Sequence, residues 1–413
     1  MTHFLTWAIA AATIAGILFR PREWPEAIWA CAGALLLILC RLIPVSDAAA
    51  AVLKGTDVYL FLTGMMLLAD LARREGVFDW LASLAVHASR GSRARLFFLI
   101  YAVGVLVTVF LSNDATAVVL TPAVFAAVRR ARAEAQPYLF ACALIANAAS
   151  FVLPISNPAN LVVYGRNLPA LLPWLREFAL PSLLSIAATY LLLRLFFRAP
   201  LRGSLDPDTS PVNLSPAGRR AVLGVAFTGA ILITASGLGL DLGLPTCLAA
   251  IFSVIVATRG SAVAAWRIAR EVSWSVLPLV AGLFVLVAAL NLTGASQAVG
   301  ETLRYYGSLP EWAGMLASSF GVAALSNVMN NLPSGLLVGS ALQTQNLAPP
   351  LRSAVLIGVD LGPNLSVTGS LATVLWLIAL RREGHKVGGF TFLKCGLAAM
   401  PPALLLATLA LLV

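Results

Sequence analysis

The chain has 413 residues, of which 60% are hydrophobic and only 11% are charged. Several windows, such as Ala27–Cys40, Ala179–Leu193 and Ser275–Leu290, carry almost no charge. A helix needs about 20 mostly apolar residues to cross a bilayer, so the composition excludes a soluble domain and predicts an all-α polytopic membrane protein. The net charge of +10 does not indicate nucleic-acid binding, because the basic residues lie between the apolar runs, where cytoplasmic loops collect them.

The N-terminal run and the cysteines set further limits. Phe4–Phe19 has no basic region before it and no small-residue cleavage site after it, so we expect a retained span rather than a signal peptide. The cysteines form no CxxC pair and the three histidines form no cluster, so neither a disulfide framework, a metal site nor a cofactor is expected. The five cysteines are Cys31, Cys40, Cys142, Cys247 and Cys395.

The first half contains three ordinary spans, then a helix that runs into Ser112-Asn113 and turns back as a re-entrant hairpin. A span interrupted by Pro, Ser and Asn follows, then an interfacial arm and a final span. The expected ranges are 4–19, 25–43 and 56–71 for the ordinary spans, 95–128 for the hairpin, 137–165 for the broken span, Asn167–Phe178 for the arm and Leu180–Phe197 for the final span.

The second half repeats this order at a nearly constant offset. Its hairpin is expected to turn at Ser326-Asn327. Its expected ranges are 220–236, 242–258 and 272–292 for the spans, 311–342 for the hairpin, 351–380 for the broken span, Glu383–Lys394 for the arm and Cys395–Val413 for the final span. We therefore predict two repeats, 1–198 and 219–413, joined by a linker at 199–218. A hairpin enters and leaves on one face, so each half crosses five times and the second repeat is inverted.

The basic residues support this topology. With five crossings per half, 22 of the 28 Lys and Arg residues fall on one side and six on the other. The positive-inside rule assigns the richer side to the cytoplasm. A bacterial inner-membrane protein with both termini on the outer side is expected.

The chemistry is expected where the backbone is irregular at membrane depth, because such backbone must line a cavity or be buried in protein. The hairpin tips and broken spans are predicted to converge near the midplane and to bind a small polyhydroxy substrate or an ion. The alternative is that some of these polar residues only cap half-helices or join helices. The predicted substrate-binding residues are Ser112, Asn113, Asn157, Asn160, Ser326, Asn327, Asn330, Asn331, Asn364 and Thr368.

Two acidic residues, Asp114 and Asp360, fall inside these segments, whereas Asp57 and Asp70 lie at span ends and are explained by solvation. An acid at the centre of a membrane helix costs about 2.5–3.5 kcal/mol to insert and usually marks an ion or proton pathway. Asp114 and Asp360 are the predicted proton-coupling residues; the alternative is a structural cap on a broken helix. The chain has no GxxxxGK[ST] loop, so ATP hydrolysis by that route is excluded.

Three stretches resemble the ArsB arsenite/antimonite permeases of the ion transporter superfamily: Ser112–Pro122, Met329–Pro333 and Gly358–Thr373. The resemblance covers essentially the whole chain. It implies export of arsenite and antimonite from the cytoplasm by proton exchange. It leaves open an ArsA-type ATPase subunit and a homodimer as partners. It also implies a site at Asn113, Asp114, Asn330, Asn331, Asp360 and Asn364.

One segment departs from the family pattern. Asn147 stands where ArsB-like sequences often carry an acid, and Ser156–Asn160 is similar to relatives that move silicate or other anions. The same fold with silicate, another small anion or sodium as cargo is therefore the alternative. A dicarboxylate is disfavoured because no Lys or Arg falls at the hairpin tips. From other classes, a channel would show no concentrative transport, and a protease is disfavoured because neither HExxH nor GxSxG is present.

Overall fold

The computed structural model describes residues 2–205, 212–345 and 347–413. Over these residues the fold is all-helical, with one isolated bridge between Ser92 and Ser204. The predicted all-α class is confirmed.

The first half alternates long helices with short, broken ones. Its elements are α1 (Thr2–Phe19), α2 (Glu26–Leu39), α3 (Val45–Lys54), α4 (Thr56–Arg74), α5 (Val77–Ala88), α6 (Arg93–Phe110), the π-helical η2 (Ala115–Leu120), α7 (Thr121–Arg130), α8 (Gln136–Ala148), the 3₁₀ turn η3 (Pro154–Ser156), α9 (Pro158–Tyr164) and α10 (Leu171–Phe196).

The second half repeats the order of the first, helix by helix. Its elements are α11 (Pro216–Gly237), α12 (Gly243–Ala257), α13 (Ala262–Glu271), α14 (Val276–Leu292), α15 (Ala295–Gly307), α16 (Glu311–Met329), α17 (Asn331–Thr344), α18 (Pro349–Leu361), the 3₁₀ turns η5 (Gly362–Leu365) and η6 (Val367–Gly369), α19 (Leu371–Arg382) and α20 (Gly389–Leu409).

Among the described residues, six helices are long and apolar enough to cross a membrane: α1, α6, α10, α11, α16 and α20. Two bent pairs, α3–α4 at 46° and α13–α14 at 45°, raise the number to eight if each pair is one span. The shorter apolar helices include α2 and α12. The chain is therefore a multi-pass membrane protein.

Some details differ from the sequence-based expectation. Helices α3, α5, α13 and α15 were not predicted, because at 10–13 residues they are shorter than a membrane span. The arm predicted at Asn167–Phe178 is not separate, since α10 begins at Leu171 and runs on through Pro181. The predicted linker begins after α10; its residues 206–211 lie outside the described part, and Leu205 N donates to Gly91 O at 2.7 Å.

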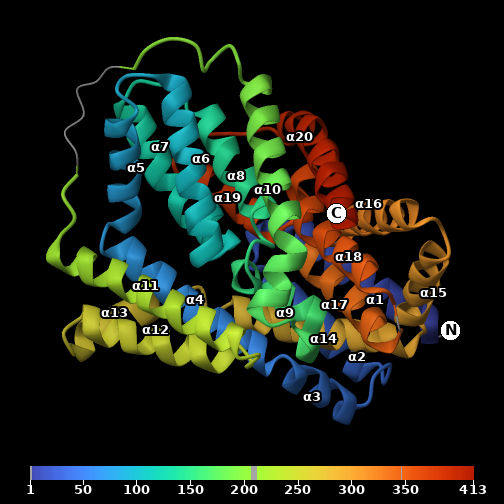
Figure 1. Cartoon of the computed structure of the whole chain (residues 1–413). Helices are drawn as coiled ribbons and strands as arrows, with labels where there is room; N and C mark the ends of the chain where they lie inside the picture. Colours follow the sequence, from blue (N-terminus) through green and yellow to red (C-terminus); the bar gives the residue numbers. More distant parts are fainter. Residues whose placement is uncertain (1, 206–211, 346) are drawn as a thin grey trace.

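The helices form two groups, each built from both halves. The first group contains α1–α4 and α11–α14, in which α4 packs on α12 and α2 packs on α14. The second contains α6–α10 and α16–α20, in which α10 packs on α20 and α9 packs on α17. Figure 1 shows α4, α11, α12 and α13 together below α6, α7, α8 and α19.

Close helix contact in the first group depends on two glycines. A Cβ at Gly64 of α4 would lie 2.6 Å from Thr246 O, and one at Gly243 of α12 would lie 2.2 Å from Asp57 O. Small residues allow backbones to approach in this way inside membranes. Asp57 Oδ1 also accepts a hydrogen bond from Gly243 N at 2.7 Å. Asp57 thus caps α12 across the interface, so solvation alone, as the sequence suggested, does not explain it.

Candidate functional site

The first hairpin turns at Ser112, between α6 and η2. Ser112 has a φ of 154°, unusual for a residue other than glycine. Asn113 Oδ1 accepts a bond from the Asp114 backbone N–H at 2.9 Å, which helps to fix the turn. The hydroxyls of Thr108 and Thr116 lie 2.8 Å apart and join the two arms.

The second hairpin turns at Asn330, which has a φ of 76° and separates α16 from α17. The hydroxyls of Ser326 and Ser334 lie 3.1 Å apart and join its arms, as the threonine pair does in the first hairpin. The prediction that Ser326-Asn327 forms this tip is therefore wrong by one helical turn. Asn331 is buried at the start of α17.

The break in the first broken span is organised by two asparagines. Asn160 Nδ2 donates to the carbonyls of Ser150, Leu153 and Pro154 at 3.0, 3.3 and 3.2 Å. Asn157 Oδ1 caps α9 by accepting a bond from its backbone at 3.0 Å. Asn160 thus satisfies carbonyls that the interrupted helix leaves without partners, which membranes require.

The second broken span is tied to the second hairpin. Asn327 Nδ2 donates to Gly362 O at 2.8 Å, and its Oδ1 accepts a bond from Ser366 Oγ at 2.6 Å. Thr368 Oγ1 donates to Asn327 O at 3.1 Å, and Asn330 Nδ2 donates to Thr368 O at 3.4 Å. This hairpin and this break therefore form one polar unit.

The two broken spans meet at their breaks. Asn157 Nδ2 donates to Asp360 Oδ1 at 2.9 Å, and Asn147 Nδ2 donates to Asn364 Oδ1 at 2.9 Å. All four side chains are buried, and Asp360 is 0% exposed. Asp360 Oδ2 and Asn147 Oδ1 have no hydrogen-bond partner among the described residues. Two buried side-chain pairs thus join the broken spans of the two halves.

A cavity of about 650 Å³ opens between the two helix groups and reaches the first hairpin tip. Its described lining comes from α4, the first hairpin, the start of α9, the α13–α14 bend and α19. Of the predicted site residues, Ser112 and Asp114 belong to this lining, while Asp360 does not. The structure therefore separates the two candidate proton carriers, opening Asp114 to the cavity and sealing Asp360 at the crossing of the broken spans.

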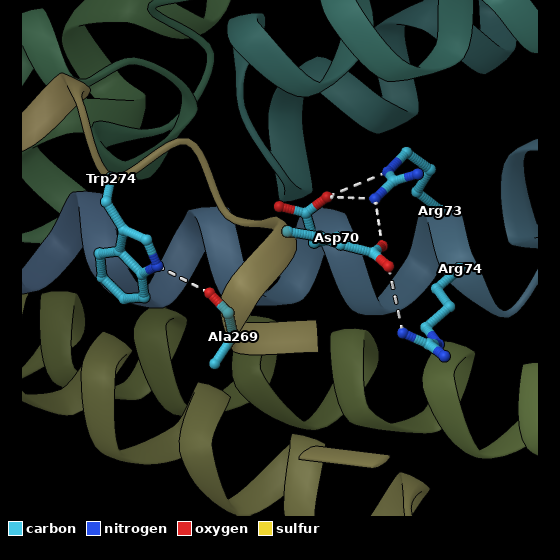
Figure 2. Close-up of polar contacts among 6 residues, drawn as sticks. Asp70, Arg73, Arg74, Ala269 and Trp274 are labelled. Atoms are coloured by element: carbon cyan, nitrogen blue, oxygen red, sulfur yellow. Dashed lines mark hydrogen bonds and ion pairs between the residues drawn. The ribbon is translucent and has the colours of Figure 1, made fainter. Parts of the chain in front are cut away.

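The mouth of the cavity carries an ion network that the sequence did not suggest. Arg73 Nη2 lies 2.9 Å from Asp70 Oδ1 and 2.8 Å from Glu271 Oε2, and Arg74 Nη1 lies 3.3 Å from Glu271 Oε1. Figure 2 shows this network between α4 and α13. Asp70, explained by solvation at the sequence level, is paired here. No local pattern would have joined Asp70 to Glu271, because they belong to different halves of the chain.

These features define a membrane transporter rather than an enzyme: paired hairpins, two broken spans that cross at polar breaks, and a cavity that ends at one hairpin tip. Comparison with known proteins identifies the family to which this transporter belongs. The chain belongs to the citrate transporter family, CitMHS, whose family model matches residues 13–358.

Several relatives carry a more particular name. The chain is 27% identical to the "Arsenical pump membrane protein" of Escherichia coli over 98% of both chains. It is 26% identical to the "Putative arsenical pump membrane protein" of Bacillus subtilis over 94% of each. Among solved structures, the YdaH transporter of Alcanivorax borkumensis shares the fold, with a TM-score of 0.60 and 15% identity over 93% of this chain and 96% of that one. The predicted resemblance to ArsB permeases is confirmed.

Proposed function

We propose that this ArsB-type transporter exports arsenite and antimonite from the cytoplasm in exchange for protons. The near full-length similarity to proteins named arsenical pump membrane protein supports the cargo. The observation that carries the mechanism is the position of Asp114, at the inner end of an open cavity between the two helix groups.

The inner end of this cavity suits a small neutral hydroxide. Pro158 and Leu371, the first residues of α9 and α19, line it beside Ser112. Leu371 presents a backbone N–H at the start of α19, whereas Pro158 has none; the Ser112 hydroxyl and the Asp114 carboxylate add acceptors, so the lining offers partners to the hydroxyls of As(OH)₃. No cysteine belongs to the described lining, so the cavity does not offer a thiolate arsenic site.

Proton coupling supplies the driving force in this proposal. As(OH)₃ is neutral at pH 7, so the membrane potential alone cannot expel it. Asp114 carries the exchanged proton in this conformation because it lines the cavity, and cargo and proton compete for the hairpin tip. Asp360, the second predicted proton carrier, is sealed here and becomes available only if the broken spans separate.

In this proposal some of the predicted binding residues form the cargo site, and the others hold the hairpins and the breaks in place. Asn113, Asn330, Asn331 and Asn364 belong to the tips and breaks that shape the site, and Ser112 contacts the cargo directly. Asn160 and Asn327 hold backbone carbonyls of the breaks, and Ser326 joins the arms of the second hairpin. Asn157 and Thr368 fix the breaks to neighbouring elements.

We assign the cavity mouth to the cytoplasm of a bacterial inner-membrane protein. Arg73 and Arg382 at the mouth lie on the side that carries most of the basic residues, and the positive-inside rule makes this side cytoplasmic. Both termini then face outward. The repeats at 1–198 and 219–413 supply the two inverted halves. A homodimer and an ArsA-type ATPase subunit remain candidate partners.

Arsenite uptake into everted membrane vesicles tests the proposal. Vesicles acidified inside by respiration should accumulate arsenite, and collapsing the proton gradient with an ionophore should abolish the accumulation. Asp114→Asn should abolish it too, at equal amounts of folded protein. Vesicles containing the transporter that accumulate no more arsenite than vesicles without it would refute the cargo. Accumulation that survives the ionophore would refute the coupling.

A further inference from the structure

The ion network at the cavity mouth decides which charges may enter. Among the described lining residues, four are acidic and two are basic. Both basic residues lie near the mouth. The acidic residues are Asp70, Asp114, Glu271 and Glu383, and the basic ones are Arg73 and Arg382.

The guanidinium groups on the α4 side of the mouth are occupied. Arg73 contacts both Asp70 and Glu271, and Arg74 contacts the other oxygen of Glu271. A free guanidinium pair is the usual protein partner for carboxylates and phosphates. Here Asp70 and Glu271 occupy both groups, so on the α4 side an incoming anion meets arginines that are already paired.

Glu271 lies at the end of α13, directly before a turn that is closed by a side-chain hydrogen bond. Trp274 Nε1 donates to Ala269 O at 2.7 Å, which closes the turn after α13, the helix that ends at Glu271 (Figure 2). The side chains of Arg73 and Glu271 are 44% and 45% exposed. Ion pairs at this exposure contribute little to stability.

The inner end of the cavity makes such screening necessary. The N-terminus of α19 lies there, and the positive end of a helix dipole attracts anions. Without a barrier at the mouth, cytoplasmic phosphate or carboxylates would reach the hairpin tip and compete with a neutral cargo.

We propose that Asp70 and Glu271, by masking Arg73 and Arg74, form a charge filter that keeps anions out of the cavity and admits neutral and cationic solutes. The filter sets specificity at entry, apart from the polar residues at the hairpin tips. The part that concerns competition with arsenite rests on the proposed function; the filtering of charge does not.

A cysteine placed inside the cavity measures the filter independently of cargo. Leu375 of α19 lines the cavity, and Leu375→Cys is introduced into a chain in which the exposed Cys31 and Cys40 are serine. The same chain without the new cysteine gives the background. Rates of modification by a cationic and an anionic methanethiosulfonate reagent, each divided by its rate with a free thiol, give a charge preference.

The filter predicts that the cation is preferred, and that Asp70→Asn with Glu271→Gln shifts the ratio toward the anion by about tenfold, the lower range for a charged cleft. The matched control, Glu75→Gln with Asp79→Asn, removes the same charge from two residues outside the described lining. The control should leave the ratio unchanged. An unchanged ratio in the filter variant, or an equal shift in the control, would overturn the proposal.

A second measurement uses transport. Phosphate or citrate outside everted vesicles should inhibit arsenite uptake by the filter variant at least tenfold more strongly than uptake by the unmodified protein. Equal inhibition of both proteins would contradict the filter. If arsenite proves not to be the cargo, this measurement fails for every variant while the cysteine measurement still decides the filter.

Discussion

The hydrogen bond between Asn157 and Asp360 is one of the direct links between the two broken spans, and a double-mutant cycle measures its strength. The donor and acceptor lie 2.9 Å apart, and both residues are buried. Asp360 Oδ2 already lacks a partner among the described residues. Loss of Asn157 would therefore leave the Asp360 carboxyl without a hydrogen bond from any described side chain.

The expected magnitudes follow from these contacts. Asn157→Ala removes the cap of α9, at about 1 kcal/mol, and leaves a buried acceptor unsatisfied, at about 1–3 kcal/mol. Asp360→Ala leaves the Asn157 amide unsatisfied, at about 1–3 kcal/mol. The double variant loses the cap, but it leaves neither an unsatisfied carboxyl nor an unsatisfied amide behind. The coupling free energy should therefore be the sum of the two unsatisfied-partner costs, about 2–6 kcal/mol, well above the error of additivity for independent sites.

The assay is the free energy of unfolding in detergent micelles, followed by circular dichroism during denaturant titration. Asn291→Ala serves as the control partner, because Asn291 Nδ2 donates to Ser340 Oγ at 3.2 Å and makes no hydrogen bond with Asp360 in the described part of the chain. Its cycle with Asp360→Ala should be additive within about 0.5 kcal/mol. A coupling as small for Asn157 as for Asn291 would refute the claim that this bond joins the two breaks.

Three further predictions concern positions where the packing is explicit. Asn160→Ala should lower the free energy of unfolding by about 1–3 kcal/mol in the same titration, because break carbonyls lose their donor. Gly339→Val should lower the melting temperature and the folded yield on gel filtration, since a Cβ there would lie 2.8 Å from the backbone of α9. Gly237→Val meets nothing within 4 Å and should leave the folded yield nearly unchanged. Asp57→Ala should cost about 1 kcal/mol in the titration through the lost cap on α12.

The sequence was sufficient for the repeated order of spans, hairpins and broken helices, because apolar run length and Pro, Ser and Asn interruptions are local properties. It misplaced the second hairpin tip because two motifs compete there. Ser326-Asn327 resembles the first tip, whereas the chain turns at Asn330. The hydroxyl pairs Thr108–Thr116 and Ser326–Ser334, which occupy equivalent positions in the two hairpins, agree with this turn.

The environment of each acidic side chain could not be predicted from local sequence patterns. Asp114 and Asp360 look alike in sequence, since both stand beside an interrupted helix. Which one faces a cavity depends on how the halves pack. The same holds for Asn147, whose partner Asn364 belongs to the other half, and for Asp70 and Glu271, which meet only because α4 packs against α13.

The central claim is that Asp114, not the buried Asp360, carries the exchanged proton in the conformation described here, whose cavity opens at the mouth beside Arg73 and Arg382. The most direct measurement compares two modes of arsenite transport in everted vesicles: accumulation driven by a proton gradient, and exchange of internal for external arsenite without a gradient. Asp114→Asn should retain exchange and lose gradient-driven accumulation. An Asp114→Asn variant that accumulates arsenite as the unmodified protein does would contradict the account, and so would loss of accumulation confined to Asp360→Asn.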